Sequence, residues 1–139
     1  MQFFRILFPV CLLFSTMTSV WALDFHPGNW EFVVKQGMKG MPGGMGEKEW
    51  RECLTQANPI PTVYLQARNC RVLESHAVYR TLHYQLSCFS EHGTMTNEGK
   101  IHFGSFRMEG SSKSDVGDVA GENMVMRYKF TGRRIGDCN

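Results

Sequence analysis

The sequence predicts an all-β domain, an antiparallel meander curled into a small barrel or half-barrel, with a short helix or turn around residues 47–56 and two disulfides. Three observations support this fold class. Apolar residues alternate with a period of two from Val63 onward, turn residues recur about every ten positions, and no segment keeps a helical period. One apolar face per strand indicates a single sheet wrapped around a single core.

The first strand is expected over residues 30–35, where Trp30, Phe32 and Val34 share one face. Residues 37–46 are rich in glycine and methionine and are predicted to be a loop. Residues 47–56 carry charge but no long apolar stripe, and prolines follow them, so we expect only a short helix or turn there.

The clearest strand is predicted over residues 78–88, with Arg80 interrupting its apolar face near the start. That face carries Val78, Leu82, Tyr84, Leu86 and Cys88. Further strands are expected over residues 94–102, 106–110 and 124–131, and residues 111–122 are predicted to be a polar connection.

Residues 1–22 have the features of a cleaved secretory signal peptide. Arg5 is its one charge, an apolar run follows from Ile6 to Met17, and cleavage is expected near Ala22. The run is too short to span a bilayer comfortably, so we expect no membrane span once the signal is removed. The exported domain is then residues 23–139.

The charge of the chain argues against some partners. Loss of Arg5 with the signal lowers the formal net charge from +2 to +1, and charges of both signs are interspersed. This pattern gives no electrostatic reason to expect nucleic acid or an anionic membrane as a partner.

Four cysteines remain after the signal: Cys53, Cys70, Cys88 and Cys138. None forms a CxxC pair, which argues against a thioredoxin-like redox site and a zinc ribbon. An even number in an exported chain predicts two disulfides. The predicted meander favours Cys70 with Cys88 and Cys53 with Cys138, but four cysteines allow three pairings and these remain open.

Several segments together resemble a known family. They are GNWE at residues 28–31, a Met-Pro-Gly loop, the cysteine spacing, and the closing GRRIGDC at residues 132–138. The pattern is similar to domain of unknown function 3617, an uncharacterised family of exported bacterial proteins, and covers nearly all of the mature chain. The resemblance implies a small periplasmic or secreted β protein and supplies no catalytic residues.

The first functional hypothesis is a non-catalytic binding or interaction module without a cofactor. A barrel cavity or open end lined by aromatic residues would take an apolar small molecule, or an envelope protein would be the partner. Trp30, Tyr84 and Arg80 are the candidate ligand-binding residues, with Arg80 stacking on Tyr84 or holding an acidic group.

The alternative hypothesis is soft-metal binding by the methionine-rich loop. Met38, Met41 and Met45 would supply the thioether ligands that Cu(I) prefers. Methionine on a glycine-rich coil also serves as a mobile loop or fills apolar gaps, so both interpretations stay open. His83 and His102 are the histidines expected to face each other if their strands pair.

No motif of a known enzyme class occurs in the sequence. GxSxG and HExxH are absent, and Glu49 and Glu52, which are close in sequence, belong to a charged segment where carboxylates are usually solvated. We therefore expect no catalysis, with an enzyme of unrecognised type as the remaining hypothesis.

Overall fold

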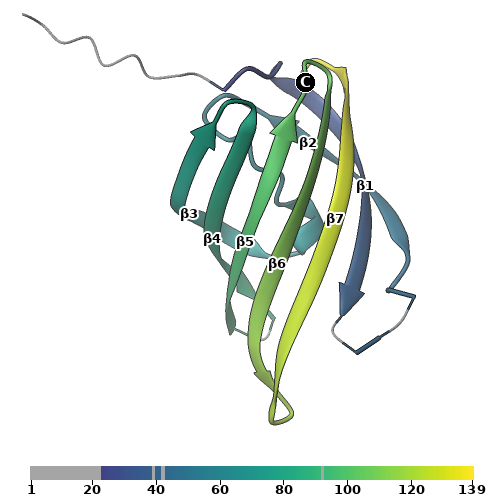
Figure 1. Cartoon of the computed structure of the whole chain (residues 1–139), viewed down its shortest axis with the longest axis vertical. Helices are drawn as coiled ribbons and strands as arrows, with labels where there is room; N and C mark the ends of the chain where they lie inside the picture. Colours follow the sequence, from purple (N-terminus) through teal and green to yellow (C-terminus); the bar gives the residue numbers. More distant parts are fainter. Residues whose placement is uncertain (1–22, 39, 42, 92) are drawn as a thin grey trace, which may run out of the picture.

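The computed structural model describes residues 23–38, 40–41, 43–91 and 93–139, so the predicted signal peptide lies outside the described residues. The described part forms seven antiparallel strands and one 3-10 helix, η1 (Val63–Leu65) (Figure 1). The strands are β1 (Gly28–Met38), β2 (Glu47–Leu54), β3 (Arg68–Val78), β4 (Thr81–Ser90), β5 (Gly93–Phe103), β6 (Arg107–Val119) and β7 (Glu122–Gly136).

The strands form one sheet in the order β2-β1-β7-β6-β5-β4-β3. The sheet curls but does not close, because β2 and β3 lie at opposite edges and do not pair. Figure 1 shows the β6–β7 hairpin extending well beyond the neighbouring strands. The prediction of an antiparallel meander curled into a half-barrel is confirmed.

The prediction of a short helix or turn at residues 47–56 was wrong. Residues Glu47–Leu54 form β2, which pairs with β1 from Gly28 to Lys35. The period of two was hidden because Lys48 and Glu52 occupy the same face as Trp50 and Leu54, and only Leu54 is fully buried there. Strand β2 is therefore held by its ladder to β1 more than by an apolar stripe of its own.

Two other strand boundaries differ from the prediction. Most of the expected polar connection, residues 111–119, is the second half of β6, which pairs with β7 as far as Val119. Its inward positions carry Ser112 and Ser114, which gave no apolar signal. The strand expected from residue 78 begins at Thr81, because residues 79 and 80 form the turn after β3.

Alternate residues of each strand point into the curl, here called the concave face, and the others point to the outer face. The concave face holds the core. Trp30, Phe32, Ile101 and Phe103 are completely buried there. The rings of Phe25 and Phe103 lie 5.1 Å apart, and Phe32 meets Phe130 edge to face at 6.2 Å. Aromatic side chains of the sheet therefore fill much of its own curl.

Three glycines on the concave face make room for these aromatic rings. A Cβ atom at Gly99 would lie 2.6 Å from the Tyr84 hydroxyl, and one at Gly132 would lie 2.6 Å from the Phe32 ring. A Cβ atom at Gly110 would overlap the ring of Phe130. Glycine in a strand interior commonly marks such a close approach.

The segment between β2 and β3 crosses from one edge of the sheet to the other and covers the concave face. Tyr64 of η1 is buried, with its ring 5.1 Å from Tyr128 and 5.4 Å from Phe130. Glu52 fixes the start of η1, because its carboxylate accepts hydrogen bonds from the backbone N–H groups of Thr62 (2.9 Å) and Val63 (3.1 Å).

Each edge strand is fastened by one disulfide. Cys53 of β2 is bonded to Cys138, which follows β7, and Cys70 of β3 is bonded to Cys88 of β4. The favoured pairing is therefore confirmed. Edge strands have neighbours on one side only and fray easily, so these bonds restrain the least supported parts of the sheet.

In the part of the chain that the structure describes, no helix has the length and apolar character needed to cross a membrane.

The close packing over Gly110 predicts a large effect of one methyl group. Gly110→Ala should lower the free energy of unfolding by about 1–3 kcal/mol, because the ring of Phe130 must move. Gly37→Ala is the matched control, since nothing lies within 4 Å of its added Cβ atom and its φ is not positive. Urea unfolding of both variants measures the difference. Equal stability of the two would contradict the packing described here.

The two disulfides should differ in their contribution to stability. They join residues 85 and 18 positions apart. Restriction of the unfolded chain then predicts a loss of about 4–5 kcal/mol for the double variant Cys53→Ala/Cys138→Ala and about 3 kcal/mol for Cys70→Ala/Cys88→Ala. Chemical unfolding of the two double variants tests this order, and the reverse order would show that the entropy of the unfolded chain does not dominate.

The carboxyl of Glu52 should make stability depend on pH. Burial raises its pKa above the usual 4.5, although hydrogen bonds from Val63 and Thr62 oppose the shift. A raised folded-state pKa means that the folded protein holds this proton more tightly than the unfolded chain. The contribution is therefore present below about pH 4.5 and is lost as the pH rises through the folded-state pKa.

Glu52→Gln is the matching neutral variant for this test. Relative to Glu52→Gln, the wild-type protein should lose unfolding free energy between about pH 4 and about pH 7. Urea unfolding at the two pH values measures the difference. A gap between the two proteins that stays constant, or that changes in favour of the wild type as the pH rises, would contradict a raised pKa.

Candidate functional site

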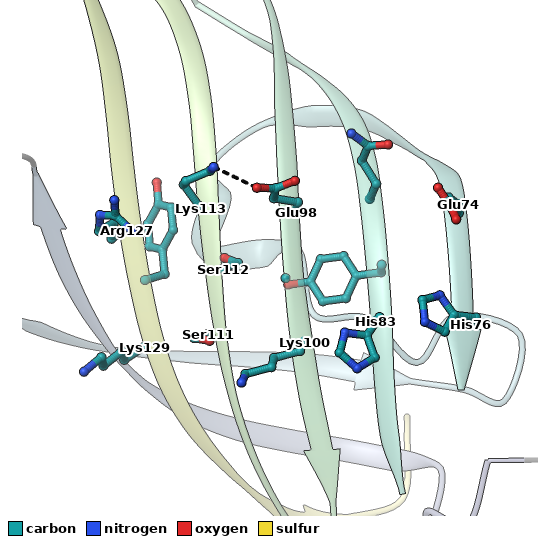
Figure 2. A pocket seen from close by; sticks show the side chains of 14 residues that line it. Glu74, His76, His83, Glu98, Lys100, Ser111, Ser112, Lys113, Arg127 and Lys129 are labelled. Carbon is teal, nitrogen blue, oxygen red and sulfur yellow. Dashed lines mark ion pairs between the residues drawn. The ribbon is translucent and has the colours of Figure 1, made fainter. Parts of the chain in front are cut away.

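The outer face of the sheet carries two rows of polar side chains, each row taking one residue from each of five neighbouring strands. The strand register places His76, His83, Lys100, Ser111 and Lys129 in the first row. It places Glu74, Gln85, Glu98, Lys113 and Arg127 in the second. Figure 2 shows the labelled members of both rows side by side across β3 to β7.

These two rows line an open groove of about 810 Å³, which we call the outer groove. Its floor is formed where the backbone passes Gly99, and the inward-pointing Tyr84, Ser112 and Tyr128 also contribute to it. A second hollow of about 510 Å³ adjoins it and shares Lys100, Ser111 and Lys129 with it. These three residues therefore lie at the centre of a continuous depression on the outer face.

The cations of the outer groove differ in their partners. Lys113 donates to Glu98 at 2.8 Å, and the dashed line in Figure 2 marks this ion pair. Within the described part of the chain, Lys100, Arg127 and Lys129 have no ion-pair partner. The groove thus contains positive charge that the protein does not itself neutralise.

Two histidines close the β3 end of the first row. The rings of His76 and His83 are stacked, with centroids 5.0 Å apart and an angle of 10° between their planes. The expected pairing of His83 with His102 was wrong, because the register sets His83 opposite Lys100 and His102 opposite Thr81. A nitrogen of the His102 ring instead lies 3.2 Å from the Thr81 hydroxyl.

A cluster of oppositely charged side chains lies on the outer face near the β2 edge of the sheet. Glu31 on β1 accepts from Arg133 at 2.7 Å and forms an ion pair with Arg51 at 2.8 Å. Arg133 first, and then Arg51, lower the pKa of the Glu31 carboxyl. These charges satisfy one another across β2, β1 and β7, so they hold the sheet edge together and offer little to a ligand.

The three residues predicted to bind a ligand do not converge. Trp30 is completely buried in the core, and its indole N–H donates to the His26 carbonyl at 3.2 Å. Arg80 lies in the β3–β4 turn and pairs with Asp24 at 3.3 Å, so its prediction on an apolar strand face was wrong. Tyr84 points inward and reaches only the floor of the outer groove.

Beneath the outer groove, the concave face contains a small polar network. The Tyr64 hydroxyl lies 2.9 Å from that of Ser112, and the Asn97 amide donates to Ser112 and Ser114 at 3.1 and 2.8 Å. Burial raises the pKa of the Tyr64 hydroxyl well above its ordinary value. The Tyr64 hydroxyl therefore stays neutral at physiological pH, and the network serves to hold η1 on the sheet.

The three methionines proposed as metal ligands lie in two environments. Met38 ends β1 and faces Met126 of β7 in register, with its side chain partly buried. Met41 and Met45 belong to the β1–β2 loop and are about half exposed, at 47% and 48%. Residues 39 and 42 of this loop lie outside the described residues. Soft-metal binding by these side chains stays a prediction.

Hard-metal and acid–base sites receive no support from the clusters present. Among the described residues, no group of three His, Cys, Asp or Glu side chains is placed to hold a metal ion. Glu49 and Glu52 point to opposite faces of β2, with Glu52 committed to the start of η1. Their closeness in sequence therefore creates no carboxylate pair.

The residues at the centre of the outer groove were not singled out by sequence reasoning. Lys100, Ser111 and Lys129 come from three strands and are separated by about ten or twenty positions along the chain, so they form no motif. The alternation of β5 and β7 places Lys100 and Lys129 on polar faces. Only the register of three strands brings them into one row.

Comparison with known proteins gives one result. A search among curated proteins and a search among solved structures each found no match. The family described as Protein of unknown function (DUF3617) matches residues 25–138, which covers almost the whole described domain. The resemblance expected from the GNWE segment, the cysteine spacing and the GRRIGDC tail is thereby confirmed, and the chain belongs to the DUF3617 family.

Proposed function

We propose that this protein is an exported, non-catalytic binding module whose ligand site is the outer groove. The observation that carries the proposal is the continuous depression centred on Lys100, Ser111 and Lys129, with two cations that have no ion-pair partner in the described chain. A concave site with a few convergent polar groups is the usual form of a small-molecule site.

Export is supported by two features of the chain. The leader at residues 1–22 has the charge and apolar pattern of a signal peptide. Two disulfides fasten the domain, and such bonds persist in oxidising compartments such as the bacterial periplasm. Both features favour a periplasmic or secreted protein.

Placing the ligand on the outer face follows from how the concave face is used. A carrier for an apolar molecule needs space inside the curl, yet Trp30, Phe32 and Phe103 are fully buried there. The ring of Tyr64 also packs on Tyr128 and Phe130 on this face. The outer groove needs no rearrangement of this core. We therefore favour a surface-bound ligand over the apolar cargo expected from sequence.

A non-catalytic role is favoured by the chemistry of the groove. Its side chains are ammonium, guanidinium, hydroxyl and imidazole groups on the surface of a rigid sheet, beside a lysine–glutamate pair. A serine nucleophile would need an adjacent base that is itself oriented by a third group. Lys100 and Lys129 flank Ser111 in its row, but within the described part of the chain no hydrogen bond joins either lysine to the serine hydroxyl or orients it. The nearest histidine in that row, His83, lies beyond Lys100.

Copper binding is the second candidate, because the register sets Met38 directly opposite Met126 on the concave side. The Met126 sulfur already accepts weak hydrogen bonds from Gln36 at 3.8 Å and Tyr128 at 3.7 Å. A metal ion would have to compete with these contacts, so we rank this function second.

Blocking the groove provides the test. Ser111→Phe places a large ring at the centre of the outer groove, and Thr94→Phe adds the same ring at an exposed position of β5 that does not line it. Each mature protein is purified from the periplasm with its disulfides intact and weighed by native mass spectrometry. A small-molecule adduct on wild type and Thr94→Phe, lost from Ser111→Phe, is the expected result.

An adduct that persists in Ser111→Phe, or the bare protein mass in all three samples, would contradict a ligand site in the groove. A copper adduct that is retained in Ser111→Phe but lost from Met38→Leu would favour the second candidate. Thermal unfolding of the variants checks that each is folded.

A further inference from the structure

We infer that the ligand of the outer groove carries a phosphate group, held over Ser111 between Lys100 and Lys129. The inference rests on the proposed function, because it names the chemistry that this same groove would recognise. It is carried by the register of three adjacent strands, by the absence of ion-pair partners for the two lysines, and by the positions of the nearby carboxylates.

The register fixes the spacing of the donors. Lys100 pairs with Ser111 across β5 and β6, and Ser111 pairs with Lys129 across β6 and β7. Neighbouring strands lie about 4.8 Å apart, so the two lysine Cα atoms flank Ser111 at a separation of roughly 10 Å. Figure 2 shows Ser111 between the two lysines on the same side of the sheet. Long side chains at this spacing can converge on one anion above the serine.

The groups at this centre are hydrogen-bond donors. Each ammonium offers three N–H groups and no acceptor, and the serine hydroxyl adds an O–H. Arg127 and Lys129 are successive outward-pointing residues of β7. Arg127 also has no ion-pair partner in the described chain. A phosphate has enough oxygens to meet donors arriving from several strands at once, whereas a carboxylate has two.

Carboxylates surround this centre and limit the size of the anion. Glu98 is occupied by Lys113, Glu74 lies at the β3 end of the groove, and Glu109 lies in the adjoining hollow. An extended polyanion such as nucleic acid would have to pass these negative charges, which repel it. A ligand with a single phosphate group occupies only the space over Ser111, with Glu98 and Glu109 one outward position away on β5 and β6.

The test is a calorimetric titration of the mature, oxidised protein with inorganic phosphate at low ionic strength. Lys100→Gln and Lys129→Gln should each weaken binding by about five-fold or more, since each removes a charge-assisted donor. Lys48→Gln is the matched control, because it removes the same charge from an exposed lysine of β2. Lys48 lies on the concave face of the sheet, away from the outer groove. This variant should change the affinity by less than about two-fold.

The source of the phosphate is tested by a parallel titration with phosphatidylglycerol vesicles. A lipid headgroup is the source if the protein binds the vesicles, if inorganic phosphate displaces them, and if this binding depends on Lys100 and Lys129. Binding of inorganic phosphate without vesicle binding identifies a soluble phosphate compound. Both results support the inference.

Three outcomes would overturn it. They are the absence of phosphate binding, equal weakening by Lys48→Gln and Lys100→Gln, and vesicle binding that phosphate does not displace. The groove-blocking variant Ser111→Phe distinguishes failure of this inference from failure of the proposed function. A neutral ligand that is lost in Ser111→Phe would leave the groove as the binding site while refuting a phosphate ligand.

Discussion

The fold depends on how an open sheet covers its own concave face. A half-barrel leaves one side of its core exposed, and here the crossing segment between β2 and β3 lays Tyr64 over that side. The Tyr64 ring packs on Tyr128 and Phe130, while its hydroxyl meets Ser112. Glu52 anchors the start of this cover through two backbone N–H groups. Because core side chains fill the concave face and the segment between β2 and β3 covers it, we place the ligand on the outer face.

The two disulfides belong to the same design. A domain of this size buries only about two thirds of its unfolded surface, so its edges have little apolar support. Strand β2 is mostly charged and β3 is exposed along most of its length. Cys53 ties β2 to the segment after β7, and Cys70 ties β3 to its neighbour β4. The outer groove requires a fixed register of β3 to β7, because each of its rows takes one residue from each of these strands.

Much of the fold could be predicted from the sequence, because the alternation in β1, β4, β5 and β7 is clear and the meander then brings Cys70 near Cys88. The predictions failed where inward positions are polar. Glu52 concealed β2, and Ser112 with Ser114 concealed the second half of β6, since each makes a specific hydrogen bond in place of apolar contact. The site was harder to find. Lys100 and Lys129 are ordinary surface lysines in a near-neutral sequence, and only strand pairing gathers them beside Ser111.

The most direct measurement is carbon-13 NMR of dimethylated lysines in the mature, oxidised protein. The spectrum of the protein as isolated from the periplasm is compared with that of the same protein after unfolding, removal of small molecules and refolding without reduction. If the outer groove holds the ligand, the resonances of Lys100 and Lys129 differ between the two samples while that of Lys48 does not. Unchanged resonances of Lys100 and Lys129 would contradict the site described here, and a shift at Lys48 alone would place the ligand on the concave side.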